Sequence, residues 1–139
     1  MSLSSTSSNI SKSSSSIEIY QGESKDLELE IVKDVDQPDG STIEEPVDLT
    51  GAKVCFTVKK RVGDVDALIS KDSTNALDIE IVTPPEDGMA IIHIVNDDTF
   101  NLEPGSYVFD IWAVLSSGKK AIVIEPSEFI VKEPVTKDC

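Results

Sequence analysis

Few residues in this sequence have the chemistry that catalysis requires. Enzyme sites combine a base, a nucleophile or a metal held in register, and the chain has one histidine, His93. No sequence neighbour suggests a partner for it, and its place in the apolar run 89–95 is typical of a partly buried strand residue. The sequence also lacks a glycine-rich phosphate loop, a nucleophile elbow and a two-histidine zinc motif. We therefore expect no enzyme activity, no catalytic residues, no cofactor and no metal.

The two cysteines, Cys55 and Cys139, match no metal-binding or redox spacing. Alternation places Cys55 on the polar side of its strand, and Cys139 is the final residue. One interpretation is two free thiols. The other is that Cys139, on a mobile tail, cross-links to another subunit, which a non-reducing gel would show.

An acidic loop offers the carboxylates that calcium prefers. Asp34 and Asp36 have the first two spacings of an EF-hand loop, and Glu45 falls at its twelfth position. Pro38, however, occupies the third ligand position, and Gly40 comes one residue late. Strand patterns rather than helices flank the loop. We therefore expect a solvated hairpin loop, with weak calcium binding at these three acids as the alternative.

Trp112 is the strongest candidate for a contact with another protein. If Tyr107, Phe109 and their alternating successors face a core, then Val108, Trp112 and Val114 share the opposite face. A tryptophan with valine neighbours on an outer face is typical of an interface anchor. The alternative is that loops cover both faces of this strand, because periodicity determines the alternation but not which face is buried.

The charge of the chain excludes two classes of partner. Twelve basic and 26 acidic residues give a net charge of -14 over 139 residues, so phosphate backbones repel it and we expect no nucleic acid. The longest wholly apolar run, residues 111–115, is far shorter than the roughly 20 residues of a membrane span. No secretory signal is recognisable. Residues 17–51 hold eleven acids against Lys25 and Lys33, so much of the acidity belongs to the first strands and their loop.

The N-terminal 16 residues differ from the rest of the chain. They contain ten serines and one charged residue, Lys12. Such a tract buries too little surface to offset the entropy of ordering it. We expect a flexible arm over 1–16, or an extended arm that orders on a neighbouring subunit, which would bring Lys12 to an interface.

From residue 17 the sequence alternates with a period of two, which predicts strands. Turn residues separate about eight such segments, and residues 97–102 favour one short helical turn. The alternating segments are residues 17–20, 27–31, 52–58, 77–81, 89–95, 107–115, 121–124 and 128–132. This pattern predicts an all-β protein, an immunoglobulin-like antiparallel β-sandwich or a small barrel. The domain would span 17–133, followed by a tail over 134–139.

The core that these segments would bury follows from the same alternation. We expect it to consist of Leu27, Leu29, Ile31, Val54, Phe56, Val58, Ile79, Ile92, Ile94, Tyr107, Phe109 and Ile111. The acidic residues between them would keep the outer faces in water and discourage edge-to-edge pairing.

Three segments in order resemble a known family. They are IYQGE at 19–23 before the strand 27–32; VDLTGA at 47–52 leading into VCFTVK at 54–59; and DTFNLEPGSYVFDI at 98–111, followed by Gly118 and EFIV at 128–131. Together they resemble the immunoglobulin-like N-terminal module of tailed-phage upper-baseplate proteins and related tail, fibre and head-decoration proteins. The resemblance covers roughly residues 17–133.

That resemblance implies a role in a virus particle. It predicts a non-enzymatic structural protein of a tailed-phage virion, assembled in the host cytoplasm, that contacts other virion proteins and is oligomeric in the particle. The chain stops soon after the sandwich, which favours a small accessory, adaptor or decoration subunit of the baseplate, tail, neck or head. The alternative is a carbohydrate- or receptor-binding sandwich, which requires an exposed aromatic platform.

Overall fold

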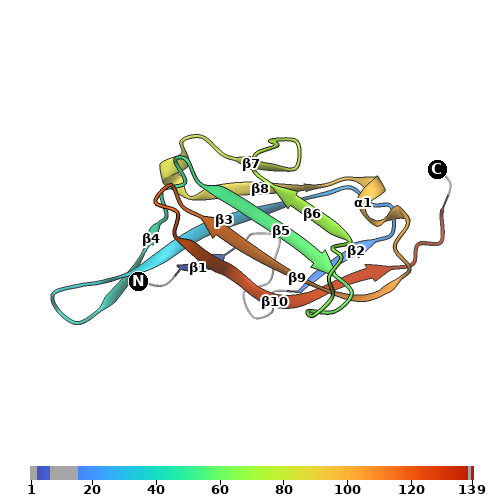
Figure 1. Cartoon of the computed structure of the whole chain (residues 1–139), viewed down its shortest axis with the longest axis horizontal. Coiled ribbons are helices and arrows are strands. Elements are labelled where there is room, and N and C mark those ends of the chain that lie inside the picture. The colour runs from blue at the N-terminus through green and yellow to red at the C-terminus, as the bar shows by residue number, and fades with distance from the viewer. Residues whose placement is uncertain (1–2, 7–15, 138) are drawn as a thin grey trace.

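The computed structural model describes residues 3–6, 16–137 and 139 (Figure 1). Within these residues the strands are β1 (Leu3–Thr6), β2 (Ile17–Tyr20), β3 (Lys25–Asp36), β4 (Thr42–Pro46), β5 (Lys53–Lys59), β6 (Ile69–Asp72), β7 (Ile79–Ile81), β8 (Met89–Ile94), β9 (Gly105–Val114) and β10 (Lys120–Lys132). A 3-10 turn, η1 (Pro85–Asp87), precedes β8, and the helix α1 (Asn96–Phe100) follows it. None of the helices in this part of the chain is long and apolar enough to cross a membrane.

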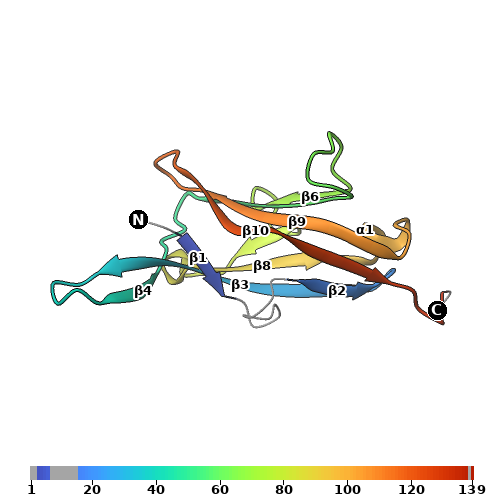
Figure 2. The same cartoon turned by 90° about the horizontal axis from the view of Figure 1, so that it is seen from below.

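The strands form two sheets that lie face to face (Figure 2). Sheet A has the order β1-β3-β8-β7, and β4 also pairs with β3. Sheet B has the order β2-β10-β9-β5-β6. The paired strands are antiparallel, apart from β2, which runs parallel to β10. The predicted all-β sandwich is confirmed, and the barrel alternative is wrong because the two sheets remain separate.

The strand order makes this sandwich immunoglobulin-like. In that fold, strands A, B, E and D form one sheet and strands C, F and G form the other. Here β1, β3, β8 and β7 correspond to strands A, B, E and D, and β5, β9 and β10 correspond to strands C, F and G. Tyr107, at the start of β9, donates a hydrogen bond to the Glu103 carbonyl at 2.6 Å. This is the tyrosine corner that marks the fold.

Three phenylalanines form the centre of the core. Phe56 of β5, Phe109 of β9 and Phe129 of β10 have ring centroids 5.8 to 6.4 Å apart. Phe109 lies two residues after Tyr107, where antibody domains carry the second cysteine of their inter-sheet disulfide. Phe109 therefore occupies the position of that cysteine and packs against Phe56 and Phe129. All twelve predicted core residues are buried; the prediction missed Phe129, Ile19 and Leu49, which are buried too.

Two element predictions are wrong in part. The predicted segments 121–124 and 128–132 form one continuous strand, β10, whose register against β9 shifts between Ile122 and Ile124 and again between Ile124 and Ser127. Pro126 lies in the second shift, because a proline has no amide hydrogen for the ladder and is accommodated at a bulge. The predicted segment 77–81 begins only at Ile79, and Leu77 is 81% exposed.

The Ser-rich arm contributes a strand to sheet A. Residues 3–6 form β1, which pairs antiparallel with β3 from Leu3 opposite Lys33 to Thr6 opposite Glu30. The arm thus contains an extended segment that pairs within its own chain. Residues 7–15, among them the predicted interface residue Lys12, lie outside the described residues.

A hairpin of β3 and β4 extends beyond the end of the sandwich (Figures 1 and 2). All five residues of β4 are exposed. The turn depends on Gly40, whose φ of 89° favours glycine, and on Asp39, whose carboxylate accepts hydrogen bonds from the Ser41 amide and hydroxyl. The expected solvated hairpin loop is therefore confirmed.

Candidate functional site

The predicted interface residues of β9 lie on the outer face of sheet B. Along this strand Tyr107, Phe109, Ile111 and Ala113 are buried, and the residues between them point outward. Trp112 is 39% exposed, and Val108 and Val114 are half-buried. The alternative that loops cover this face is wrong for Trp112. Its role as an interface residue stays a prediction.

Sheet pairing places Trp112 between neighbours from the two adjacent strands. Cys55 of β5 lies opposite it on one side, and Ile122 of β10 on the other. The indole Nε1 donates a hydrogen bond to the Asp110 carboxylate at 3.1 Å. The tryptophan is therefore oriented by its own strand while its ring remains accessible.

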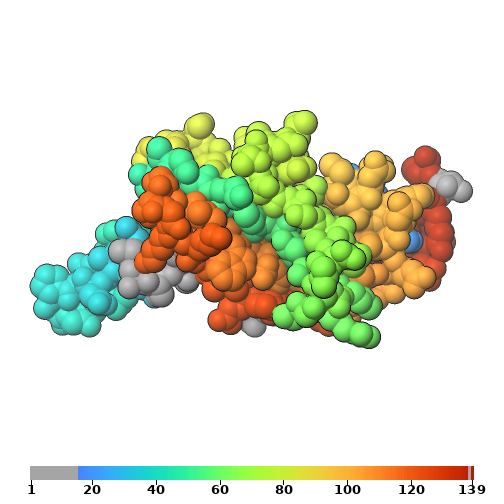
Figure 3. All heavy atoms as spheres, viewed as in Figure 1, coloured from blue at the N-terminus to red at the C-terminus, as the bar shows by residue number. Residues whose placement is uncertain are grey.

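A shallow hollow opens beside Trp112. Its volume is about 210 Å³, and it is lined by Thr57, Lys59, Val62, Val108, Phe109, Asp110, Trp112 and Pro126. The exposed Val62 comes from the β5–β6 connection and Pro126 from the bulge of β10. In Figure 3 the β5 and β6 region (green) and the β9 and β10 region (orange) face the viewer. This combination of an exposed indole, aliphatic walls and a carboxylate can bind a protruding side chain or a small ligand.

The fold separates the charges of the chain by sheet. Residues 25–51 and 73–104, which include β3, β4, β7 and β8, carry two bases and sixteen acids. Residues 52–72 and 105–132, which include β5, β6, β9 and β10, carry eight bases and six acids. Segments 25–51 and 73–104 thus carry a charge of -14, and segments 52–72 and 105–132 carry +2, to which β2 of sheet B adds one acid, Glu18. The Trp112 face belongs to the one part of the sandwich that is not strongly acidic.

His93 has two partners that sequence reasoning missed. It lies on the outer face of sheet A, where its Nδ1 is 2.8 Å from the Asp26 carboxylate and its Nε2 is 3.4 Å from Glu80. The hydrogen bond with Asp26 raises the pKa of His93 above its ordinary value of 6.5, against the opposing effect of burial. Strand pairing creates the cluster, since Asp26 is 67 residues away in sequence.

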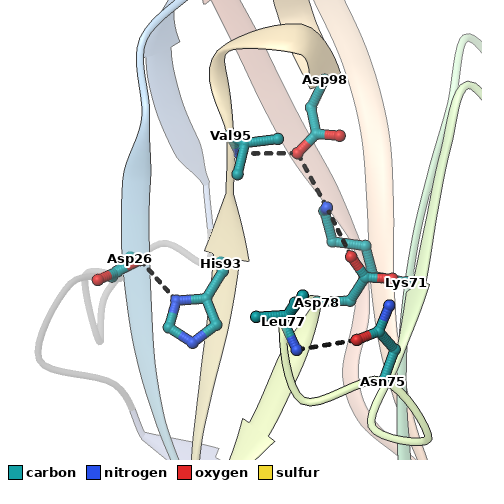
Figure 4. A network of polar contacts seen from close by, with 8 residues as sticks. All are labelled: Asp26, Lys71, Asn75, Leu77, Asp78, His93, Val95 and Asp98. Atoms are coloured by element: carbon teal, nitrogen blue, oxygen red, sulfur yellow. Dashed lines mark hydrogen bonds and ion pairs between the residues drawn. The ribbon is translucent and has the colours of Figure 1, made fainter.

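Lys71 is a buried charge with two acidic partners (Figure 4). Its side chain is 6% exposed, and its Nζ lies 2.9 Å from Asp98 of α1 and 3.5 Å from Asp78, just before β7. Asp98 also accepts a hydrogen bond from the Val95 amide at 2.8 Å. The cluster ties β6 of sheet B to α1, which follows β8, and to the residue just before β7. A signal for it exists in the sequence, because Lys71 stands two residues after the inward-facing Ile69.

The two cysteines are free thiols in this chain. Cys55 is half-buried beside Trp112, and burial raises its pKa. Cys139 is exposed and lines a second hollow with Gln21, Gly22, Asn96, Phe100, Pro134, Thr136 and Lys137. Cross-linking of Cys139 to another subunit stays a prediction.

The three acids of the EF-hand-like spacing are not brought together by the hairpin. Asp34 and Asp36 lie on β3, where they pair with Glu44 and Thr42, while Glu45 lies opposite Lys33. Over residues 3–6, 16–137 and 139, no three His, Cys, Asp or Glu side chains converge as metal ligands. The hairpin spreads these acids along two strands, whereas an EF-hand loop wraps them around one ion.

Comparison with known proteins gives distant structural matches. No family model matches the chain, and no curated protein does. Among solved structures, a family 123 glycoside hydrolase from Clostridium perfringens matches 86% of this chain at 13% identity and a TM-score of 0.39. This chain spans 23% of the hydrolase chain. Murine CRIg matches 96% of this chain over 99% of its own length, at 12% identity and a TM-score of 0.38. The immunoglobulin-like assignment rests on the strand order and the Tyr107 corner.

Proposed function

We propose that this chain is a non-enzymatic structural subunit of a tailed-phage virion, and that it acts through protein–protein contacts made by the outer face of sheet B. The observation that supports a contact role is Trp112, an exposed indole beside a hollow on the one sheet that is not strongly acidic. Buried aromatic anchors in pockets concentrate the energy of protein interfaces. The phage assignment is supported by the resemblance of residues 17–59 and 98–131 to phage baseplate, tail and head-decoration modules.

Two measurements test the virion role. Mass spectrometry of purified particles should detect this chain, and the purified protein should bind an isolated particle component. Trp112→Ala should weaken that binding by at least about tenfold, as expected for an interface anchor. The matched control is Leu77→Ala, which truncates an exposed apolar residue elsewhere. Absence from the particles together with no binding to any component would refute the role.

A carbohydrate-binding role is the alternative, because Trp112 lies beside Asp110 and Thr57 in the same hollow. An indole face and nearby polar groups can bind a sugar ring. Trp112 is the single tryptophan of the chain, so its fluorescence reports directly on this hollow. A glycan array followed by fluorescence titration should give a saturable change if a sugar binds. A blank array would leave the protein-contact role as the better explanation.

A further inference from the structure

The outer face of sheet A presents an aliphatic residue between two acids. Glu28 of β3 and Glu80 of β7 both lie opposite Ile91 of β8, so the three form one row across the sheet. Ile91 is half-buried, and both glutamates are exposed. In the adjacent rows Asp26 lies opposite His93 and Glu30 lies opposite Met89. The face thus has a central stripe of half-buried side chains with carboxylates beside it.

The outer face of sheet B presents the same arrangement with the opposite charge. Lys53 of β5 and Lys120 of β10 both lie opposite Val114 of β9. Val114 is half-buried, and both lysines are exposed. The next row holds Cys55, Trp112 and Ile122, which carry no charge. The acids follow on the other side of the Trp112 row. Asp110 is the next outward residue of β9 and bonds the indole, and Glu125 and Glu128 are exposed on β10, with Glu128 opposite Val108.

These two rows fit each other in spacing as well as in charge. Neighbouring strands lie about 4.8 Å apart, so the flanking charges of either row are separated by about 10 Å. Sheets that stack face to face lie about 10 Å apart with their strands nearly aligned. In such a stack the two glutamates would meet the two lysines while Ile91 and Val114 meet between them, and Trp112 would reach the stripe of β8. If two sheet A faces met instead, the acids of one copy would repel those of the other. These acids are Asp26, Glu28, Glu30 and Glu80.

We propose that copies of this chain stack head to tail, with the outer face of sheet A of one copy on the outer face of sheet B of the next. The stack rests on the proposed function, since it assigns the occupant of the Trp112 face. Such a contact is heterologous, so it leads to a ring or an open filament and not to a closed two-fold dimer.

The size of the faces predicts a weak contact in dilute solution. Sheet A limits the contact, because β4 continues beyond the sandwich and leaves four strands side by side, β1, β3, β8 and β7. Four strands of about six residues give roughly 400 Å² on each partner from the strand spacings. The total of about 800 Å² lies below the range of stable specific interfaces, which begins near 1,200 Å². Association should therefore be seen at high protein concentration and low salt, where surface charges are least screened.

The test is sedimentation velocity of the full chain up to about 0.5 mM protein in about 0.02 M salt, where the Debye length is about 20 Å. The wild type should sediment faster as its concentration rises. Glu28→Lys with Glu80→Lys should weaken association at least about tenfold, and so should Lys53→Glu with Lys120→Glu, because each opposes like charges. Mixing the two double variants should restore association, since an acidic face then meets a basic one again.

The matched control is Glu44→Lys with Glu45→Lys on β4, which changes the net charge by the same amount away from both faces. This variant should associate as the wild type does. A wild type that stays monomeric would overturn the stack. Continued association of the Glu28 and Glu80 variant by itself would also overturn it, since sheet B would then be pairing with itself. Detection of the chain in particles is independent of these results, so the stack can fail while the virion role stands.

Discussion

Lys71 is the buried charged residue of the part of the chain that the structure describes. A charge removed from water is tolerated only with close partners, and Lys71 has Asp98 at 2.9 Å and Asp78 at 3.5 Å. The two acids differ, because Asp98 is 18% exposed and also receives the Val95 amide, whereas Asp78 is 37% exposed. Asp98 is therefore the partner on which the ammonium group depends.

We predict that Asp98→Ala destabilises the fold more than Lys71→Met does. The first change leaves a buried ammonium group with its weaker partner and removes the acceptor of the Val95 amide, which should lower the free energy of unfolding by about 3 kcal/mol. The second keeps the aliphatic stem and leaves Asp98 hydrogen-bonded, at a cost of about 1 kcal/mol. Urea unfolding measures both. Asp97→Ala, at an exposed neighbour, should change stability by less than about 0.5 kcal/mol, and the reverse order of the two main variants would contradict the assignment.

His93 makes the stability of the fold depend on pH. Its partners raise its pKa above 6.5, so the folded state binds the proton more tightly than the unfolded state does. The stabilisation is complete below pH 6.5 and is lost as the pH rises through the folded pKa. Since Asp26 and Glu80 are largely exposed, the effect should be about 0.5 kcal/mol.

We predict that wild type exceeds His93→Gln in stability at pH 5.5 and that this difference disappears by about pH 9. Unfolding curves of both proteins at several pH values give the difference directly. In an Asp26→Asn background the same comparison should give a smaller difference, because the first partner is gone. A difference that grows with pH would show that the sign is wrong.

At the scale of elements, the β3–β4 hairpin is separable from the sandwich. β4 is exposed at all five positions, and its pairs with β3 begin at the buried Val32, opposite Pro46, and continue outward from the sandwich to Asp36. Ordered surface strands of this kind contribute little burial, so their removal should not disturb the core.

We predict that replacing residues 35–43 by Asn-Gly leaves the fold intact. Asp34 and Glu44 are cross-strand partners, and a two-residue Asn-Gly turn closes such a pair. The melting temperature should change by no more than about 4 °C, equivalent to about 1 kcal/mol. Thermal unfolding followed by Trp112 fluorescence measures it. A loss of cooperative unfolding would mean that the hairpin is part of the core structure.

At the scale of the whole molecule, the separation of charge between the sheets has an energetic cost. Sixteen acids against two bases lie in the segments that build sheet A, and repulsion among them opposes compaction. Sheet B carries most of the bases, which explains how a chain of net charge -14 retains one face that an acidic surface can approach.

We predict that salt stabilises the monomer. Raising NaCl from about 0.02 to 0.5 M shortens the Debye length to a few ångströms and screens the repulsion within sheet A. The free energy of unfolding should rise by on the order of 1 kcal/mol. Denaturation in urea at micromolar protein, where stacking is negligible, measures this. The gain should shrink in the Glu28→Lys, Glu80→Lys variant, and an equal gain there would contradict the assignment to sheet A.

Local alternation was sufficient for much of the fold. It correctly predicts the two-sheet sandwich, twelve buried core residues and the outward direction of Trp112, because in a strand the side-chain period of two assigns each residue to a face. It fails where local sequence carries no such signal. The short strands β1, β4 and β6 were not predicted, and the passage of β10 through Pro126 depends on a bulge that its partner strand accommodates.

Only the tertiary structure decided which residues act together. Asp26 reaches His93, and Lys53 lies opposite Val114, because antiparallel pairing joins strands that are far apart in sequence. Glu80 and Lys120 complete the two rows from the strands that come just before β8 and just after β9. Composition gives the net charge of the chain, but only the fold shows where the acidic residues lie. The acidic segments alternate along the sequence with less acidic ones and assemble into sheet A. Composition and period are local properties, whereas the pairing of strands is set by the packing of the whole chain.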